Sequence, residues 1–327
     1  MRIGEVAERA GVDVETLPAL LHVTNGESAG NTLRQTGLGG AVLSWQDVLH
    51  EGPVPALPRP RLREARARFL SDCGWGSRRS ILAGLERRDR LVAAAPHAVL
   101  WFEHDLYDQL QLLEALTVAA DGARLELIDA GRFLGPLPAA ELEALWPLRQ
   151  PVTAELLELA RAGWAAFTAP EPTVLAAFLE RDTSALPHLA PALRRLLEEL
   201  PDDAGLSRSE RQLLELLADG PRTPPQLFAE TQRLEEAPFE GDAWVWRRIA
   251  SLVPLVDPVP PPPPLGDARR FAATQVTLTD AGRAVLGGQA DAVELRGIDR
   301  WLGGTHLTPD ALWRRGRGGE IRRAPAP

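Results

Sequence analysis

The chain has 327 residues, of which 45% are hydrophobic and 25% charged, and its formal net charge is -9. These values are average for globular proteins, so they exclude a disordered or fibrous chain, and the length predicts roughly two domains of about 100 to 200 residues. No run approaches the ~18 apolar residues of a membrane-spanning helix. The first residues are followed by charged residues rather than by the apolar stretch of a signal peptide, so we expect a cytoplasmic protein without membrane contact.

Residues 1–20 are predicted to form an amino-terminal extension of two short helices separated by a turn at Gly11. Residues 1–17 resemble the opening helix-turn-helix of the MerR-type regulators. The resemblance stops at Pro18, where that family continues with an arginine and aromatic run, a wing and a dimerisation helix. We interpret the segment as a fusion remnant or extension, and a working DNA reader is the alternative.

Residues 21–136 are predicted to form an α/β domain, because buried strands alternate with helices. The strands are expected at residues 21–24, 41–45, 98–102 and 125–128, and the helices at residues 31–36, 61–70, 78–94 and 107–119. This alternation predicts a Rossmann-like, mostly parallel sheet covered by helices on both faces. In such sheets ligands bind beyond the carboxyl ends of the strands, where the strand order switches. The polar segments after the first three strands are therefore the candidate site.

The rest of the chain is predicted to be helical at first and then mixed. Residues 137–205 are rich in leucine and alanine and indicate a helical connector. Residues 206–327 indicate a winged-helix-like domain with an arginine-rich tail, because helices at residues 206–218, 223–235 and 242–252 precede strands at residues 255–257 and 275–279. The proline run at residues 260–264 favours extended geometry and is expected at the tip of the wing.

The segment after the third strand of the α/β domain carries Glu103, His104, Asp105 and Asp108, with Tyr107 between them. Titratable side chains at a strand end become partly desolvated and can then act as an acid, a base or a metal ligand. We assign His104 and Asp105 as candidate catalytic residues and the other three as candidate ligand-binding residues, with a divalent metal as the candidate cofactor. The alternative is a structural network in which Asp108 caps the next helix.

A second cluster follows the second strand, where Asp47, His50 and Glu51 precede Gly52. On one helical turn Asp47 and His50 would share a face, which suits a histidine oriented by a carboxylate as a general base or a metal ligand. We assign these two as candidate catalytic residues. Glu51 and Gly52 are candidate ligand-binding residues, since glycine permits close approach of the backbone.

The loop after the first strand, Asn25, Gly26, Glu27 and Ser28, precedes a helix and offers amides and a hydroxyl to a phosphate or carboxylate. It lacks the pattern of a dinucleotide or P-loop fingerprint. Because Glu27 repels anions, an anion there needs help from an arginine or a metal. Arg66 is the candidate arginine, and an exposed helix charge is the alternative.

Residues 22–29, 45–53 and 101–110 together resemble the bacterial family called domain of unknown function 1835. The resemblance runs from about residue 21 to near residue 314. The family carries no settled activity, so the resemblance indicates which residues matter and assigns them no role.

The carboxyl-terminal part carries the candidate nucleic-acid residues Arg247 and Arg248 on the third helix and Arg314 and Arg315 in the tail. Arginines beside tryptophans suit contacts with phosphates or bases, and a frayed end is the alternative for the tail. The acidic net charge argues against a protein that coats nucleic acid, although a local basic patch remains compatible with DNA.

Two hypotheses follow. In the first, the α/β domain binds or acts on a small phosphorylated or nucleotide-like ligand, with metal assistance, and the winged-helix-like domain is an accessory. In the second, the protein is a DNA-binding transcriptional regulator whose α/β domain senses a ligand. The third helix of the rear domain discriminates between them: packing of Trp244 and Trp246 against the connector favours the first, and arginines that point outward favour the second.

Overall fold

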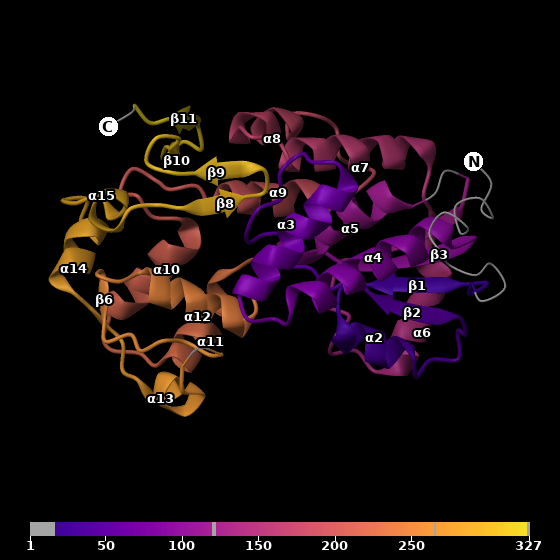
Figure 1. The fold of residues 1–327 in the computed structure, drawn as a ribbon, viewed down its shortest axis with the longest axis horizontal. Helices are drawn as coiled ribbons and strands as arrows, with labels where there is room; N and C mark the ends of the chain where they lie inside the picture. Colours follow the sequence, from indigo (N-terminus) through magenta and orange to yellow (C-terminus); the bar gives the residue numbers. More distant parts are fainter. Residues whose placement is uncertain (1–16, 120–121, 265, 326–327) are drawn as a thin grey trace.

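The structure is a computed structural model that describes residues 17–119, 122–264 and 266–325. The MerR-like resemblance and nearly all of the predicted extension lie outside the described residues. Figure 1 shows two parts side by side, which we call the front part, residues 17–205, and the rear part, residues 206–325. No helix in the described ranges is long and apolar enough to cross a membrane.

A five-stranded sheet lies at the centre of the front part. Its strands are β1 (Leu21–Thr24), β2 (Ala41–Ser44), β3 (His97–Glu103), β4 (Arg124–Ala130) and β5 (Gln150–Pro151), in the order β2-β1-β3-β4-β5. The first four are parallel, with Leu21 of β1 opposite Ala41 on one side and Ala98 on the other, and only β5 is antiparallel. The predicted mostly parallel α/β sheet is confirmed. The chain leaves β1 for one neighbour and returns on the other side as β3, so the order switches between β1 and β3.

Helices cover both faces of the sheet, which explains why its strands are apolar on both sides. On one face Val23 and Leu100 belong to a core shared with α5 (Leu106–Val118). On the other face Val99 and Trp101 pack with α2 (Glu27–Leu33) and with Leu142 of α6 (Ala139–Leu145). The front part therefore has a core on each side of one sheet.

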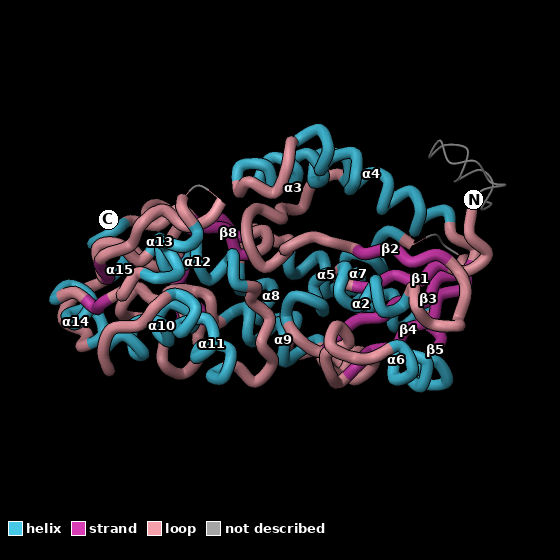
Figure 2. Tube along the Cα trace, turned by 90° about the horizontal axis from the view of Figure 1, so that it is seen from below, coloured by secondary structure: helices cyan, strands magenta, loops and turns pink. Residues whose placement is uncertain are grey.

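The first helices match the sequence prediction closely, with one exception. The helix α4 (Arg78–Ala94) has the predicted bounds, and α3 (Arg59–Asp72) is slightly longer than predicted. Figure 2 shows α3 and α4 as a hairpin raised above the edge of the sheet at β2. The helix α2 begins earlier than predicted, at Glu27, because Ala29, Gly30 and Leu33 form its buried face.

The predicted connector is helical and packs on the sheet domain. It comprises α6, the short helix η2 (Trp146–Leu148), α7 (Ala154–Phe167), α8 (Pro172–Phe178) and α9 (Leu189–Leu197). Leu159 of α7 and Leu193 of α9 belong to the same core as α5 and β1. These helices thus extend the front core.

The rear part has its own core and begins with three helices near their predicted positions. Its elements are α10 (Arg208–Ala218), α11 (Pro224–Leu234), α12 (Asp242–Ser251), β6 (Val256–Asp257), α13 (Ala268–Ala273), β7 (Thr277–Leu278), α14 (Asp280–Leu286) and α15 (Ala292–Arg296). Ser207 and Glu210 form the capping box that starts α10. The strands β6 and β7 pair antiparallel, but α13 lies between the proline run and β7, where the sequence predicted only a loop.

The carboxyl-terminal residues form two antiparallel hairpins, so the frayed tail that the sequence allowed is not observed. One consists of β8 (Arg300–Leu302) and β9 (Thr305–Leu307), the other of β10 (Trp313–Arg315) and β11 (Ile321–Arg323). The turn between β8 and β9 docks on the front part, where Val54 N donates to Gly303 O at 2.8 Å and Gly304 N to Phe167 O at 3.0 Å. The end of the chain therefore fastens the two parts together.

Candidate functional site

Three buried carboxylates meet where β3 passes into α5. Glu103 ends the strand, Asp105 is the N-cap of the helix and Asp108 lies in its first turn. One oxygen from each lies within 4.8 Å of one from the others, and all three side chains are buried. We call these residues the carboxylate cluster. It lies beside the switch between β1 and β3, which is where ligands bind in sheets of this kind.

The cluster is held by N–H donors. Asn25 Nδ2 donates to Asp108 Oδ2 at 2.7 Å, and Glu103 N donates to Asp108 Oδ1 at 2.7 Å. Asp108 N donates to Asp105 Oδ1 at 3.2 Å, and Leu134 N donates to Glu103 Oε1 at 2.7 Å. Among the residues that the structure describes, no arginine or histidine forms an ion pair with these carboxylates. The three carboxyl groups thus lack a positive partner in the described chain.

Burial and crowding disfavour the charged forms of this cluster. Burial, and then the neighbouring Glu103, raises the pKa of Asp105 to about 7. The pKa of Asp108 rises well above its ordinary value, first through burial and then through Asp105 and Glu103, and burial raises the pKa of Glu103. A bound cation would reverse this cost, because it stabilises the charged carboxylates.

A shallow groove of about 480 Å³ gives access to the cluster. Glu103 and Asn25 line it, together with Ser28, Phe133 and Gly135. The Ser28 hydroxyl donates to Gly135 O at 3.1 Å, which ties the start of α2 to the loop after β4. Two residues of the predicted loop after the first strand, Asn25 and Ser28, therefore line the same groove as Glu103.

His104 follows Glu103 in the chain and packs against the rings of Phe133 and His188. Its ring is 5.0 Å from the Phe133 ring and 5.9 Å from the His188 ring, and burial, followed by His188, lowers its pKa. Gln109 Nε2 donates to Asp129 Oδ1 at 3.0 Å. Sequence reasoning missed His188, which lies in the helical connector without a recognisable motif. Asp129 directly follows the predicted fourth strand and lies near the carboxyl end of β4, so its position at this edge of the sheet could be predicted.

A second cleft, of about 660 Å³, lies at the carboxyl ends of β1 and β2, beneath the α3–α4 hairpin. The predicted residues Gly26, Glu27 and Tyr107 line it. Sequence reasoning missed Gln46 and Trp75 in the same wall. Gln46 has a φ of 52°, and the sequence gives no signal for this left-handed backbone conformation. Its Nε2 donates to Glu27 Oε1 at 3.1 Å. Glu27 and Tyr107 thus lie together, away from the groove that Glu103 lines.

The predicted pair Asp47 and His50 does not form a site with the cluster. Asp47 is buried, and Arg66 Nη2 donates to its Oδ1 at 2.6 Å. Arg66 also donates to Val48 O at 2.8 Å and to Glu51 O at 2.7 Å. Arg66 is therefore neither exposed nor free to bind an anion, which corrects the sequence prediction. Its role is to hold the loop after β2.

His50 is buried between aromatic rings rather than oriented by a carboxylate. Its ring lies 5.9 Å from the Tyr107 ring and 5.1 Å from the Phe239 ring, and neither ring nitrogen has a hydrogen-bond partner in the described chain. Burial, and then the nearby Arg248, lowers its pKa to about 3. His50 is thus neutral near pH 7 and forms no hydrogen bond with Asp47, so the predicted acid–base pair is not observed.

Glu51 and Gly52 belong to the junction between the front and rear parts. Glu51 accepts from Arg248 Nη2 at 2.9 Å and lies 3.5 Å from Arg300 Nη2. Gly52 has a φ of 74°, and a Cβ there would lie 2.5 Å from the Phe69 ring. The predicted ligand-binding residues Glu51 and Gly52 therefore have structural contacts that explain both residue types.

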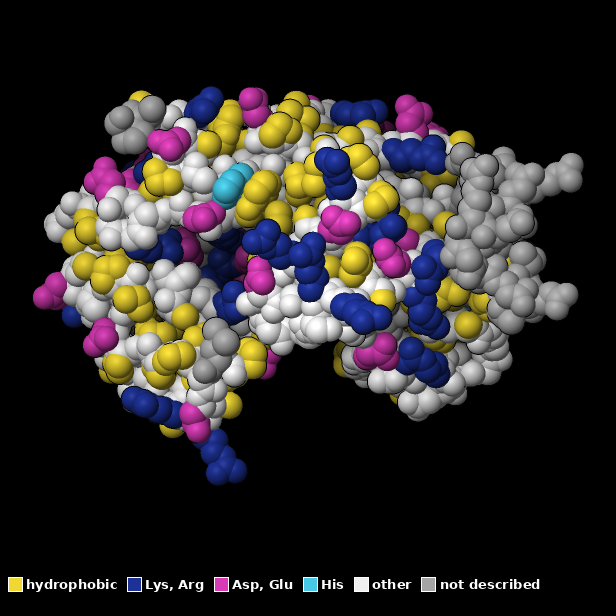
Figure 3. Space-filling view, viewed as in Figure 1, with side chains coloured by type: hydrophobic (Ala, Val, Ile, Leu, Met, Phe, Trp, Pro, Cys, Tyr) yellow, Lys and Arg dark blue, Asp and Glu magenta, His cyan; other side chains and the backbone are white. Residues whose placement is uncertain are grey.

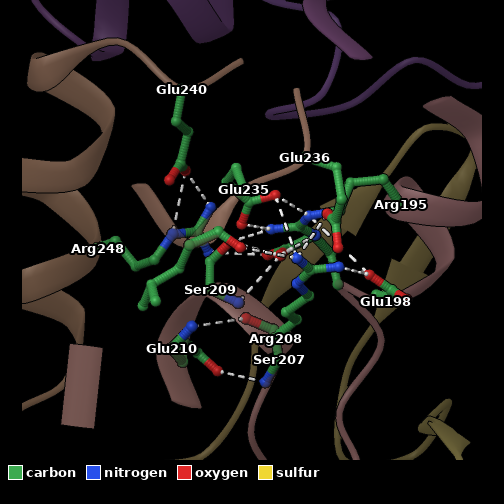
Figure 4. A network of polar contacts seen from close by, with 12 residues as sticks. Arg195, Glu198, Ser207, Arg208, Ser209, Glu210, Glu235, Glu236, Glu240 and Arg248 are labelled. Atoms are coloured by element: carbon green, nitrogen blue, oxygen red, sulfur yellow. Dashed lines mark hydrogen bonds and ion pairs between the residues drawn. The ribbon is translucent and has the colours of Figure 1, made fainter. Parts of the chain in front are cut away.

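The candidate nucleic-acid residues are mostly occupied by contacts within the chain. Arg248 is buried and pairs with Glu199 at 3.1 Å and with Glu240. Figure 4 shows Arg248 turned toward Glu240 within a wider network around Arg195. Arg247 is half-buried over the Trp244 ring. The arginines of α12 therefore do not form an outward-facing row.

The tryptophans of α12 and the arginines of the tail also make contacts within the chain. Trp244 stacks on Phe69 of α3 at 5.8 Å, and Trp246 packs on Phe271 at 5.6 Å. Arg314 Nη2 pairs with an Asp291 carboxylate oxygen at 2.6 Å, and Arg315 is half-buried in the same hairpin. Trp244 packs against the sheet domain rather than against the connector that the sequence suggested.

Comparisons of this chain with protein-family models and with curated proteins find no match. The resemblance to the domain of unknown function 1835 family therefore stays a prediction.

Proposed function

We propose that the front part binds a divalent cation at Glu103, Asp105 and Asp108 and, through that cation, a small phosphorylated or nucleotide-like molecule at the carboxyl ends of β1 and β3. The observation that carries this proposal is three buried carboxylates with no cationic side chain paired to them in the described chain. Carboxylate oxygens are the ligands that Mg²⁺ and Mn²⁺ prefer, and Mg²⁺ is commonly held by one or two carboxylates together with substrate phosphates.

The place of the cluster supports a bound molecule as well as a cation. The groove that Glu103 and Asn25 line opens at the switch in strand order. A phosphate in this acidic groove needs a metal ion to offset the carboxylates, since Glu103 alone would repel it. As part of this proposal, we take the sheet to be Rossmann-like and the chain to be related to the domain of unknown function 1835 family.

We further infer that α10, α11, α12 and the pair β6 and β7 form a winged-helix-like unit that acts as an accessory to the front part. The burial of Arg248 and the stacking of Trp244 on Phe69 support this role. DNA binding finds less support, because the surface that a recognition helix would present is turned toward the junction.

The test is binding of Mn²⁺ to the full chain, followed by electron paramagnetic resonance and by thermal denaturation. A cation that binds only the folded state raises its melting temperature. We expect Mn²⁺ binding that Asp105→Asn abolishes without unfolding, because asparagine is as good an N-cap as aspartate. Asp129→Asn at the end of β4 is the matched control and should leave binding intact.

Nucleotides and sugar phosphates are then screened with Mn²⁺ and with a chelator in its place. Ligand-induced stabilisation should require the cation and should be lost in Asp105→Asn and weakened in His104→Ala. Absence of Mn²⁺ binding at millimolar concentration, or binding that Asp105→Asn leaves unchanged, would refute the proposal.

A further inference from the structure

A cavity of about 570 Å³, which we call the junction cavity, lies between the front and rear parts. None of the residues that line it belongs to the carboxylate cluster. Its wall combines Glu51 and Phe69 of the front part with Trp244 and Arg247 of α12 and with residues 296–300, from the end of α15 to the start of β8. Figure 3 shows a hollow between the region of α12 and that of β8, with basic side chains on its walls. Cavities of ~300 to 1,000 Å³ between domains are typical small-molecule sites.

The wall of this junction cavity is rich in arginine. Four guanidinium groups line it, those of Arg247, Arg248, Arg296 and Arg300. Three carboxylates line it as well, and each already has a cationic or histidine partner. Glu51 pairs with Arg248 and Arg300, Glu210 with Arg296 at 2.6 Å, and Asp299 with His306 at 2.7 Å.

Arg247 has no such partner. No hydrogen bond or ion pair joins its guanidinium to another residue in the described ranges, and the group lies over the Trp244 ring at 5.6 Å. Arg248 and Arg300 are instead both paired with Glu199, at 3.1 Å and 2.9 Å. Of the four guanidinium groups, that of Arg247 is therefore the one left without a carboxylate partner in the described chain.

The polar atoms without partners around this cavity are donors. The indole N–H of Trp244 and the Nε of Arg296 are buried and lack an acceptor among the described residues. Phe69 and Trp244 supply an apolar wall beside them. A ligand that fits must therefore offer acceptor oxygens and negative charge, and the volume leaves room for a carbon skeleton.

We propose that the junction cavity is a second binding site, which takes a small organic anion bearing a phosphoryl group. The guanidinium of Arg247 contacts the phosphoryl oxygens, assisted by the unpartnered indole N–H of Trp244, since planar guanidinium groups bind phosphate in a bidentate manner. No divalent cation is needed, because Arg247 supplies the positive charge. This requirement separates the site from the one proposed at the carboxylate cluster.

The test is calorimetric titration of the full chain with inorganic pyrophosphate in the presence of a chelator, which removes any cation-dependent binding at the front site. We expect binding that weakens about tenfold or more in Arg247→Gln, as the loss of a charge-assisted hydrogen bond predicts, and that falls with added salt. Arg87→Gln, in the cleft beneath the α3–α4 hairpin, is the matched control and should bind as the unaltered chain does.

A second variant, Trp244→Phe, removes the indole N–H and keeps an aromatic ring against Phe69. It should also weaken pyrophosphate binding, whereas Trp246→Phe should not. The proposal is overturned by absence of binding at millimolar pyrophosphate, by binding that Arg247→Gln leaves unchanged, or by binding that Arg87→Gln abolishes. Loss of Mn²⁺ binding in Asp105→Asn without loss of chelator-resistant pyrophosphate binding would show the two sites to be independent.

Discussion

The guanidinium of Arg66 lies 2.6 Å from the carboxylate of Asp47, and both side chains are shielded from solvent. The pair fixes the loop after β2, since Arg66 also binds two backbone carbonyls of that loop. A buried ion pair with this many hydrogen bonds leaves a large uncompensated charge when one partner is removed.

We therefore expect Arg66→Met to lower the free energy of unfolding by about 3 to 5 kcal/mol, which urea denaturation measures. Arg68→Met on the same helix is the control. Arg68 is exposed and lies 3.9 Å from Asp72, so its loss should change stability by at most ~0.5 kcal/mol. Equal effects of the two substitutions would contradict this assignment.

Gly52 is required for both its backbone conformation and its space. In Gly52→Ala the left-handed φ of 74° and the contact of the new Cβ with Phe69 both oppose folding. Gly39→Ala is the matched control, because Gly39 has a φ of 69° and open space around it. We expect Gly39→Ala to cost about 1 to 2 kcal/mol and Gly52→Ala about 1 to 3 kcal/mol more, measured by thermal denaturation. Similar costs would mean that the Phe69 contact relaxes freely.

Asp105 should make the metal-free protein less stable as the pH rises. Its pKa is about 7 in the folded chain and about 4 in an unfolded one, so the folded state holds the proton more tightly. Stability from this group is therefore fully present below pH ~4 and is lost as the pH rises to ~7. Asp105→Asn should flatten this part of the pH profile in chemical denaturation with a chelator. An unchanged slope would show that Asp105 titrates normally.

The junction should show strong coupling between Arg248 and Glu199. Both are buried, and their side chains lie 3.1 Å apart. Arg248→Met leaves Glu199 and Glu240 buried with less positive charge, so it should destabilise by about 3 to 5 kcal/mol. Adding Glu199→Gln should recover part of that loss, with an interaction free energy of about 1 to 3 kcal/mol in a double-mutant cycle. Strict additivity would contradict a direct interaction.

Periodicity and turn chemistry were enough to place most of the front part. In residues 78–94 apolar side chains recur at helical spacing among charged ones, and α4 has those bounds. Strands such as β3 are apolar throughout because both faces of a parallel sheet are covered. The same rule placed Glu103 and Asp105 at a strand end, so the position of the carboxylate cluster was predictable.

The failures share one cause, which is that residues far apart in sequence decide which charges are buried. Nothing near Arg66 in the sequence indicates that Asp47 and two carbonyls enclose it. His188 comes beside His104 only because the connector folds back on the sheet. The hairpins at the carboxyl terminus were missed because their strands have only three residues each.

The partners of Glu51 have a consequence for how the chain is made. Arg248 follows it by 197 residues and Arg300 by 249. On a ribosome, the sheet domain is complete long before either arginine has been synthesised, and domains generally fold in order from the amino terminus. During that interval Glu51 faces water, which solvates its charge at no cost. In the nascent front part this carboxylate therefore stays exposed until α12, and then β8, have emerged.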